Sequence, residues 1–212
     1  DAMNPLAVAA IFTAKGRPVS HPLIVHVVDA AQVPKFASHV PAFAQKLMSA
    51  FWPGPLTVIL PRLQGVADTA AGAHPTIALR CPSHPMALAL LQEAQGLGVQ
   101  GVAAPSANLF GRVSPTTAAH VRQAFPSLLV LDGGACEVGI ESTIVDCSRT
   151  APVVLRPGML LLSALSAACG ELMAVPSDTH FSTKDDAPAA PGSLASHYAP
   201  HACLRLMSAE AI

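Results

Sequence analysis

Charged side chains are scarce in this sequence. Lys and Arg number 12 and Asp and Glu 13 among 212 residues, which is 12% of the chain, against about 25% in typical domains. The net charge of −1 argues against the broad basic face that non-specific binding to nucleic-acid phosphates requires, although a local contact with RNA stays open. Hydrophobic residues make up 51%, so the chain can bury a large core and we do not expect it to be disordered as a whole.

Long apolar runs are also missing. The most hydrophobic stretch, 159–175, contains Gly170 and Glu171 and falls short of the roughly 20 uninterrupted apolar residues that a membrane span needs. We therefore predict a buried helix in this stretch and no transmembrane segment.

Paired cysteine motifs are absent as well. The five cysteines show no Cys-x-x-Cys spacing, their number is odd, and the chain starts without a secretory leader. This combination favours reduced thiols in the cytosol, each of them a buried structural residue. The five are Cys81, Cys136, Cys147, Cys169 and Cys203.

Several common motifs of nucleotide and catalytic sites do not occur. The sequence has no Gly-x-x-x-x-Gly-Lys-Ser/Thr and no Gly-x-Ser-x-Gly, which argues against a P-loop and a serine-hydrolase elbow. The nine histidines are scattered without the spacing of metal ligands.

The elements that are present predict an α/β fold. Asn4 and Pro5 suit the start of a helix, whose residues Leu6, Ala9, Ala10 and Phe12 we expect to point inward. Several predicted strands are unbroken apolar runs, which favours strands covered on both faces, and the irregular order of elements indicates a twisted mixed sheet flanked by helices. We predict helices over 5–15, 40–51, 85–94, 161–172 and from 114 onward, and strands over 23–28, 56–60, 76–79, 99–104, 128–131, 142–145 and 153–155.

The chain divides into one main domain and a tail. Residues 1–176 hold all the predicted elements of the sheet. Residues 177–200 become polar and then rich in Pro and Ala, as in a linker. Residues 201–212 begin with a strand-like stretch that we assign to the start of a second, truncated domain.

Cations stand beside Gly, Pro or Ser at the ends of predicted strands. This placement predicts that they hold an anion, and a nucleoside triphosphate is the obvious candidate. Lys15 and Arg17 flank Gly16, so that a short loop can direct both toward one phosphate group; a solvated basic turn is the alternative. For His26, at the end of a strand, a satisfied core position is equally compatible. The other cations of this kind are Arg80, Arg112 and Arg156.

Polar turns follow some of the strands. Ser106 and Asn108 could form an anion-binding nest, although an ordinary Pro-Ser-Asn turn explains them more simply. Ser114, before Pro115, is predicted to cap a helix whose N-terminus would attract an anion. Glu141 and Asp146 could hold a metal ion, but capping of loops is the favoured interpretation.

Taken together, these segments resemble the YrdC-like threonylcarbamoyl-AMP synthase family. The resemblance covers nearly all of residues 1–175 and depends on the order and spacing of motifs that are weak one by one. The tail from Pro191 to Pro200 is similar to the linker of the family's long form, which carries a C-terminal domain. The motifs are Lys15-x-Arg17-Pro18, His26, Phe51-Trp52-Pro53-Gly54-Pro55-Leu56-Thr57, Thr76-x-x-x-Arg80-x-Pro82, Ala104-Pro105-Ser106-Ala107-Asn108, Ser114-Pro115-Thr116, Glu141-Ser142-Thr143-Ile144-Val145-Asp146 and Arg156-Pro157-Gly158.

The resemblance implies a reaction. L-threonine, bicarbonate and ATP would give threonylcarbamoyl-AMP and pyrophosphate, and the product would feed the machinery that transfers threonylcarbamoyl to tRNA. A threonine carbamate is already a nucleophile, so catalysis needs positioning and charge neutralisation and no activated Ser or Cys. Mg²⁺ is expected with ATP, and no protein ligand for it is evident.

The resemblance also implies roles for individual residues. Lys15, Arg17 and Arg80 would be catalytic. Threonine would contact His26, Arg80, Ser142 and the backbone of Ala104. ATP would contact Lys15, Arg17, His21, Thr76, Ser106, Asn108, Ser114 and Arg156, with Tyr198 of the linker closing the site.

Two departures from the family pattern and two rival functions complete the expectations. The strand and Pro-Thr-Glu-Thr-x-Tyr-Gly-Leu-Gly-like segment that usually open the domain are absent, and residues 193–196 replace basic and aromatic residues of the linker, which predicts a fragment with impaired activity.

One rival is the carbamoyl-adenylate-forming module of hydrogenase maturation proteins. The other is an RNA-binding module without catalysis.

Overall fold

The computed structural model describes residues 1–175. The proposed linker at 177–200, Tyr198 within it and the proposed second domain at 201–212 lie outside the described residues. Among the described helices, none is long and apolar enough to cross a membrane.

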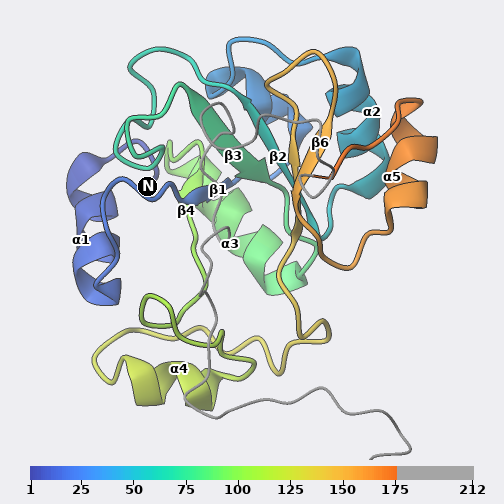
Figure 1. Ribbon diagram of the computed structural model, residues 1–212. Helices are drawn as coiled ribbons and strands as arrows, with labels where there is room; N and C mark the ends of the chain where they lie inside the picture. Colours follow the sequence, from blue (N-terminus) through green and yellow to red (C-terminus); the bar gives the residue numbers. More distant parts are fainter. Residues whose placement is uncertain (176–212) are drawn as a thin grey trace, which may run out of the picture.

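Within residues 1–175, six strands form one mixed sheet in the order β4-β1-β3-β2-β5-β6 (Figure 1). The pairs β1–β3 and β2–β5 are parallel and the other neighbours are antiparallel. This confirms the predicted α/β class with a mixed sheet. The strands are β1 (Ile24–His26), β2 (Leu56–Pro61), β3 (Thr76–Arg80), β4 (Val102–Ala103), β5 (Thr143–Asp146) and β6 (Val153–Arg156).

Local signals in the sequence explain where the first helix begins and ends. Asn4 Oδ1 accepts hydrogen bonds from two N–H groups of the first turn, and Pro5 occupies the first helical position. Gly16 ends the helix with φ of 60°, in the left-handed region that glycine adopts without strain. The described helices are α1 (Pro5–Lys15), the 3-10 helix η1 (Ala30–Lys35), α2 (Ala42–Phe51), α3 (Pro85–Gly96), α4 (Ala118–Ala124) and α5 (Leu162–Cys169).

The sheet is covered unequally on its two faces. Helices α2 and α5 lie together over one face (Figure 1), where Leu47 and Leu165 are fully buried in the main core with Leu79 of β3. Burial on both faces accounts for the unbroken apolar strands. The opposite face carries a smaller buried cluster of Ile24, Ile59, Ala78 and Ile144.

Two predicted helices bury different residues from those expected. In α1, Phe12 is buried as predicted, but Leu6 is 81% exposed and Ala9 and Ala10 are exposed, while Val8 and Lys15 are buried instead. The buried residues recur at steps of four and three, which is the spacing of one helical face. Helix α5 is likewise not buried all round, since only Leu165 and Cys169 of its residues are buried.

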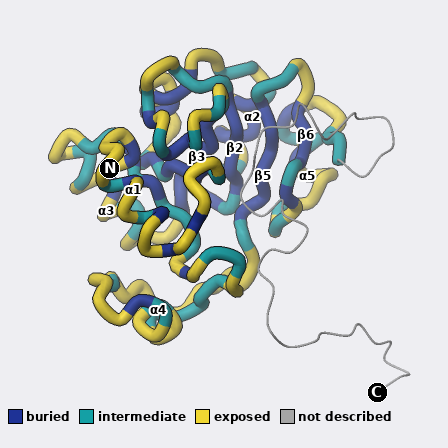
Figure 2. Tube along the Cα trace, turned by 60° about the vertical axis from the view of Figure 1, so that its left-hand side comes forward, coloured by how far each residue is buried: buried dark blue, intermediate teal, exposed yellow. Residues whose placement is uncertain are grey.

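The predicted strand at 128–131 and the predicted helix cap at Ser114 are wrong. Residues 128–131 form no strand, and Leu129 is 95% exposed. Helix α4 begins at Ala118, and Thr117 is its cap. The strand is absent because this segment belongs to the stretch between β4 and β5, residues 104–142, which we call the excursion. The part of the excursion around α4 is largely exposed and lies away from the sheet (Figure 2), so an apolar run there has no neighbouring strand to pair with.

The cysteines follow the same division between sheet and excursion. Cys81, Cys147 and Cys169 are buried as predicted, but Cys136 on the excursion is exposed. Cys203 lies outside the described residues.

Candidate active site

A row of residues at one level crosses five strands of the sheet. The register pairs His26 with Arg80, Arg80 with Thr57, Thr57 with Ile144, and Ile144 with Arg156. Directly paired residues point to the same side of a sheet, so these side chains share the face of the smaller apolar cluster. A sheet that is otherwise apolar therefore presents one imidazole, two guanidinium groups and a hydroxyl together.

Ser142 connects two of these residues just before β5. Its Oγ lies 2.8 Å from Thr57 Oγ1 and accepts a hydrogen bond of 3.0 Å from Arg156 Nη2. Arg156 also donates to the Ser142 carbonyl from Nε at 3.0 Å and from Nη2 at 2.9 Å. Thr57 and Ser142 are almost completely buried, so this end of the site is fixed before any ligand arrives.

Glu141 brings negative charge to the same place. Ser114 Oγ donates a hydrogen bond of 2.5 Å to Glu141 Oε1, and Arg156 Nη2 lies 4.0 Å from Glu141 Oε2. A residue before α4, Ser114, therefore binds one after α4, Glu141, although Ser114 caps no helix. Asp146, the other carboxylate of this segment, binds Ser148 and Arg149 and caps its own turn, as the favoured interpretation predicted.

Lys15 joins helix α1 to the turn after β4. Its Nζ donates to the carbonyl of Ser106 at 2.5 Å and to the carbonyl of Asn108. Burial is the main reason that the pKa of Lys15 falls to about 8; Arg17 lowers it further and Glu141 opposes the shift. Lys15 is thus a buried cation with a proton that it can lose near neutral pH.

Arg17 is fixed mainly by its own loop. It donates from Nε to the His21 carbonyl at 3.2 Å and from Nη2 to the Pro22 carbonyl at 2.9 Å. Its guanidinium lies 5.5 Å from the centroid of the Phe110 ring, and the His21 ring meets the same Phe110 edge-on at 5.3 Å. Burial lowers the pKa of His21, and Arg17 and His74 lower it further, so this imidazole favours the neutral form.

Burial also lowers the pKa values of His26 and Arg80, which lie at the ends of β1 and β3. It lowers the pKa of His26 to about 4, with a further lowering by Arg80, so His26 is neutral at physiological pH. Nδ1 of His26 has no hydrogen-bond partner within the described part of the chain. Arg80 donates from Nε to the Gly54 carbonyl at 3.1 Å, and its pKa is lowered by burial and by Arg156, while Glu141 raises it.

The structure brings most of the predicted site residues together in two linked groups. One group is Lys15, Arg17, His21, Ser106 and Asn108; the other is His26, Arg80, Ser114, Ser142 and Arg156. The charge of Glu141 links them, because it acts on both Lys15 and Arg80.

Three predicted residues belong to neither group. Thr76 begins β3, at the opposite end of the strand from Arg80, roughly 13 Å away at about 3.3 Å per residue. The N–H of Ala104 donates to the Ile24 carbonyl at 3.0 Å and is therefore used within the fold. Tyr198 lies outside the described residues.

The geometry makes three further residues important. Thr57 enters the sequence analysis only as part of a motif, no local pattern indicates Phe110, and Glu141 is predicted there to bind metal or to cap a loop. A buried hydroxyl within an apolar strand was the available signal for Thr57. Among the described residues, no group of three His, Cys, Asp or Glu side chains could hold a metal ion.

Two cavities lie near these residues. One, of about 330 Å³, is lined by Asn108, Arg112, Ser114 and His120 among others. Asn108 Nδ2 donates to the carbonyls of Leu109 and Arg112, while its buried Oδ1 has no partner among the described groups. Two of the residues predicted to contact ATP therefore share this hollow.

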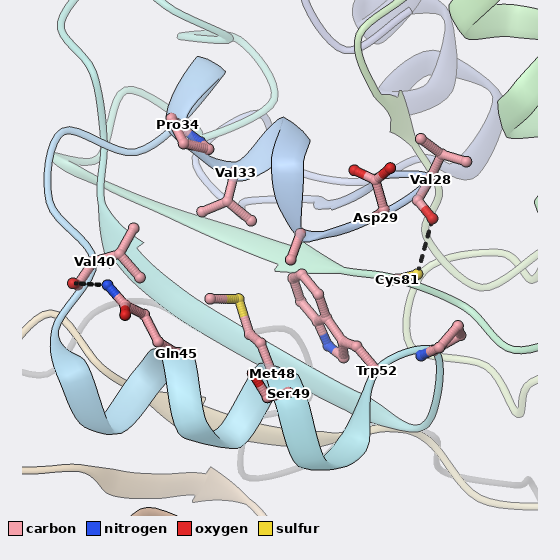
Figure 3. A pocket seen from close by; sticks show the side chains of 12 residues that line it. Val28, Asp29, Val33, Pro34, Val40, Gln45, Met48, Ser49, Trp52 and Cys81 are labelled. Atoms are coloured by element: carbon pink, nitrogen blue, oxygen red, sulfur yellow. Dashed lines mark hydrogen bonds between the residues drawn. The ribbon is translucent and has the colours of Figure 1, made fainter.

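The second cavity, of about 390 Å³, lies beside Trp52 and Met48 of the α2 region (Figure 3). It also contains Cys81, whose Sγ contacts the Val28 carbonyl. Because Cys81 follows Arg80 directly along the chain, the two side chains point to opposite sides. This cavity is therefore separate from the row of polar residues. The Gly54 backbone contacts both, since its N–H donates to the Cys81 carbonyl and its carbonyl accepts from Arg80.

The chain is similar to several known proteins. The threonylcarbamoyl-AMP synthases of Pyrococcus abyssi and Bacillus subtilis are each 40% identical to the chain, over 204 and 209 residues, which is 95% and 97% of this chain. The structure of P. abyssi Sua5 complexed with L-threonine superimposes with a TM-score of 0.84 at 39% identity, over 94% of this chain and 58% of that one. Full-length HypF, at 18% identity and a TM-score of 0.58, shares the fold alone.

The chain spans 58% of the length of both synthases. The profile of the Sua5, YciO and YrdC family, which carries the description "Telomere recombination", matches residues 1–158. With that match and these relatives, the chain belongs to the Sua5/YciO/YrdC family.

Proposed function

We propose that this chain carries the catalytic site of an L-threonylcarbamoyladenylate synthase. The substrates are L-threonine, bicarbonate and ATP, and the products are threonylcarbamoyl-AMP, pyrophosphate and the water released when threonine and bicarbonate form the carbamate. The observation that supports this most is the convergence of Lys15, Arg80 and Arg156, from three separate elements, around the Glu141–Ser142 segment. The names of the relatives, and the threonine in the complex of one of them, agree with it.

The sheet end of the site suits an amino acid. The guanidinium of Arg80 can pair with the threonine carboxylate through two parallel hydrogen bonds. His26 is neutral and offers Nδ1 to a polar group of the ligand. The Ser142 hydroxyl, held by Thr57 and Arg156, is placed to contact the same ligand.

The other end suits a triphosphate. Lys15 supplies a point charge, and Arg17 and Arg156 supply planar donors for phosphate oxygens. Ser106, Asn108 and Ser114 add hydroxyl and amide groups, and His21 joins them beside Phe110. Thr76 stays a predicted ATP contact, although it lies at the other end of β3 from Arg80. The hollow at Asn108 and Ser114 gives the rest of the nucleotide a place beside these groups.

The reaction then needs little beyond position and charge. An oxygen of the threonine carbamate forms a bond to the α-phosphorus, the bond from that phosphorus to the bridging oxygen of pyrophosphate breaks, and the electron pair leaves with pyrophosphate. Lys15 and Arg17 would neutralise the charge on the leaving group. The described residues offer no cluster of metal ligands, so Mg²⁺ would arrive bound to ATP and not to protein carboxylates.

We place the protein in the cytoplasm, where its product would pass to the machinery that modifies tRNA. Tyr198 would close the nucleotide site from the linker. A direct contact with RNA belongs to the same proposal only as a local one, because the net charge is −1.

Release of pyrophosphate tests the assignment. The full-length protein with its natural termini should release pyrophosphate from ATP only when L-threonine and bicarbonate are both present. Turnover without threonine would reject the assignment, and strict dependence on carbamoyl phosphate would favour the hydrogenase-maturation type of reaction. Absence of turnover with retained RNA binding would favour the non-catalytic module.

A further inference from the structure

Glu141 is an acidic side chain in the middle of a cationic site. Its carboxylate accepts a hydrogen bond from Ser114 and lies 4.0 Å from Arg156. Its charge also acts on Lys15 and Arg80, in both cases against the burial that disfavours their protonated forms. One carboxylate therefore lies beside Arg156 of β6 and acts through its charge on Lys15 of α1 and Arg80 of β3.

This position is unexpected for a residue in a triphosphate site. A carboxylate beside bound phosphates repels them, and the repulsion is strong where burial limits the screening by water. In the empty site the sign of the effect is reversed. Arg156 lowers the pKa of Arg80 and Arg17 lowers that of Lys15, which means that the cations repel one another and that Glu141 offsets this repulsion.

We propose that the Glu141 carboxylate is the counter-anion of the empty site, holding Lys15, Arg80 and Arg156 together until a triphosphate replaces it in that role. The proposal rests on the proposed function, in that it takes the ligand to be a triphosphate. Glu141 is a positioning residue in this account, and it touches neither substrate.

The geometry supports an exchange between the two anions. The Glu141 side chain is 30% exposed, whereas that of Arg156 is 9% exposed, so the carboxylate can withdraw toward solvent while the guanidinium stays in place. Arg156 keeps its three bonds to Ser142 without Glu141. The Ser114 hydroxyl, released from the carboxylate, becomes available to the nucleotide.

If this exchange occurs, Glu141→Gln should lower the stability of the unliganded protein and raise its affinity for phosphate. Glu141→Gln removes the counter-anion, so the cations of the empty site repel one another and the unliganded protein should melt at a lower temperature than the wild type. The same change removes the repulsion against phosphate, so inorganic tripolyphosphate in EDTA should bind about tenfold tighter at low salt. A residue that only maintains the structure would weaken both stability and binding.

Calorimetric titration with tripolyphosphate and thermal unfolding test the proposal directly. Glu137→Gln is the matched control, because Glu137 is an exposed carboxylate on the same segment; it should leave both quantities close to wild type. The gain in affinity for Glu141→Gln should shrink between 20 mM and 500 mM salt, as expected when screening weakens charge interactions.

Unchanged or weaker binding of tripolyphosphate by folded Glu141→Gln would overturn the proposal. Weaker binding of Mg-ATP together with unchanged metal-free tripolyphosphate binding would also overturn it, in favour of a role in holding the cation. If Glu141→Gln does not fold, Glu141→Asp retains the charge but withdraws it by one methylene, and it should still bind tripolyphosphate more tightly than the wild type; equal or weaker binding would overturn the proposal.

These measurements need neither threonine nor turnover, so they fail separately from the proposed function. If the protein releases pyrophosphate but Glu141→Gln does not show the two opposite effects, only the proposed exchange at Glu141 is refuted. If the two opposite effects are found but no pyrophosphate is released, the proposed reaction is refuted and the exchange stands.

Discussion

Thr57 Oγ1 and Ser142 Oγ lie 2.8 Å apart across the parallel strands β2 and β5, although 85 positions separate them in the chain. Both hydroxyls are buried, and Ser142 Oγ also accepts from Arg156. Thr57 therefore fixes the orientation of a hydroxyl that we place against threonine.

Replacing Thr57 with valine tests this relationship. The shape is kept and one buried hydrogen bond is lost, so the free energy of unfolding should fall by about 1 kcal/mol, and KM for threonine should rise more than KM for ATP. Denaturant unfolding and steady-state kinetics give the two values. The control is Thr150→Val at an exposed position, which should change neither; equal changes in both KM values for Thr57→Val would contradict the assigned role.

The pKa of Lys15 predicts a dependence of phosphate binding on pH. Because this pKa lies at about 8, binding of tripolyphosphate should weaken as the pH rises from 7 to 9 and Lys15 loses its proton. Lys15→Arg should bind with little dependence on pH over this range, since the guanidinium stays charged. A wild-type affinity that is constant between pH 7 and pH 9 would show that Lys15 does not contact the phosphates.

The same pKa gives stability the opposite dependence. The pKa of Lys15 in the folded protein is below its ordinary value of 10.5, so between these values the unfolded chain binds more protons than the folded one. The contribution of Lys15 to the free energy of unfolding should therefore increase as the pH rises through this interval. Subtracting the unfolding curve of Lys15→Met from that of the wild type isolates it, and a decrease with pH would be the wrong sign.

Gly158 lies where the backbone leaves no room for a methyl group. An added Cβ would lie 2.6 Å from Thr143 N and 2.7 Å from the Glu141 carbonyl, and both are backbone atoms that cannot move aside. We expect Gly158→Ala to lower the free energy of unfolding by about 1–3 kcal/mol and to reduce phosphate binding, because it displaces the segment that holds Ser142. Gly139→Ala is the control, since nothing lies within 4 Å of its added Cβ; equal stability of the two variants in denaturant would refute the expectation.

The proposed role of Arg80 depends on the shape of its guanidinium group as well as on its charge. Arg80→Lys keeps the positive charge but loses the fork that binds a carboxylate with two hydrogen bonds, so KM for threonine should rise at least about tenfold with a smaller effect on KM for ATP. Arg122→Lys, at an exposed ion pair of α4, should behave as the wild type. A larger effect on ATP than on threonine would move Arg80 to the phosphate end.

The sequence was sufficient where the causes of structure are local. The cap at Asn4, Pro5 and the end at Gly16 predict helix α1 correctly because each acts within one turn of the helix. Loops with cations at the ends of strands likewise indicated Lys15, Arg80 and Arg156. The family resemblance gave these residues their order, and the register of the sheet puts Arg80 and Arg156 on one face.

It was insufficient where contacts depend on distant parts of the chain. Ser114 has the local pattern of a helix cap, but its hydroxyl binds Glu141, 27 residues away, and no local rule predicts that partner. Leu129 lies in an apolar run that would suit a strand, yet no neighbouring strand is available to it. The predicted inward side of α1 was wrong at Leu6, Ala9 and Ala10, because four of the eleven helix residues are alanine and its faces differ little in hydrophobicity.

A crystal structure with L-threonine and a non-hydrolysable ATP analogue tests the central claim most directly. The account predicts phosphate oxygens within hydrogen-bond distance of Lys15 and Arg156, and the threonine carboxylate against Arg80 in the same hollow. A nucleotide bound elsewhere, such as in the cavity beside Trp52, or a threonine on a different face from the phosphates, would contradict it.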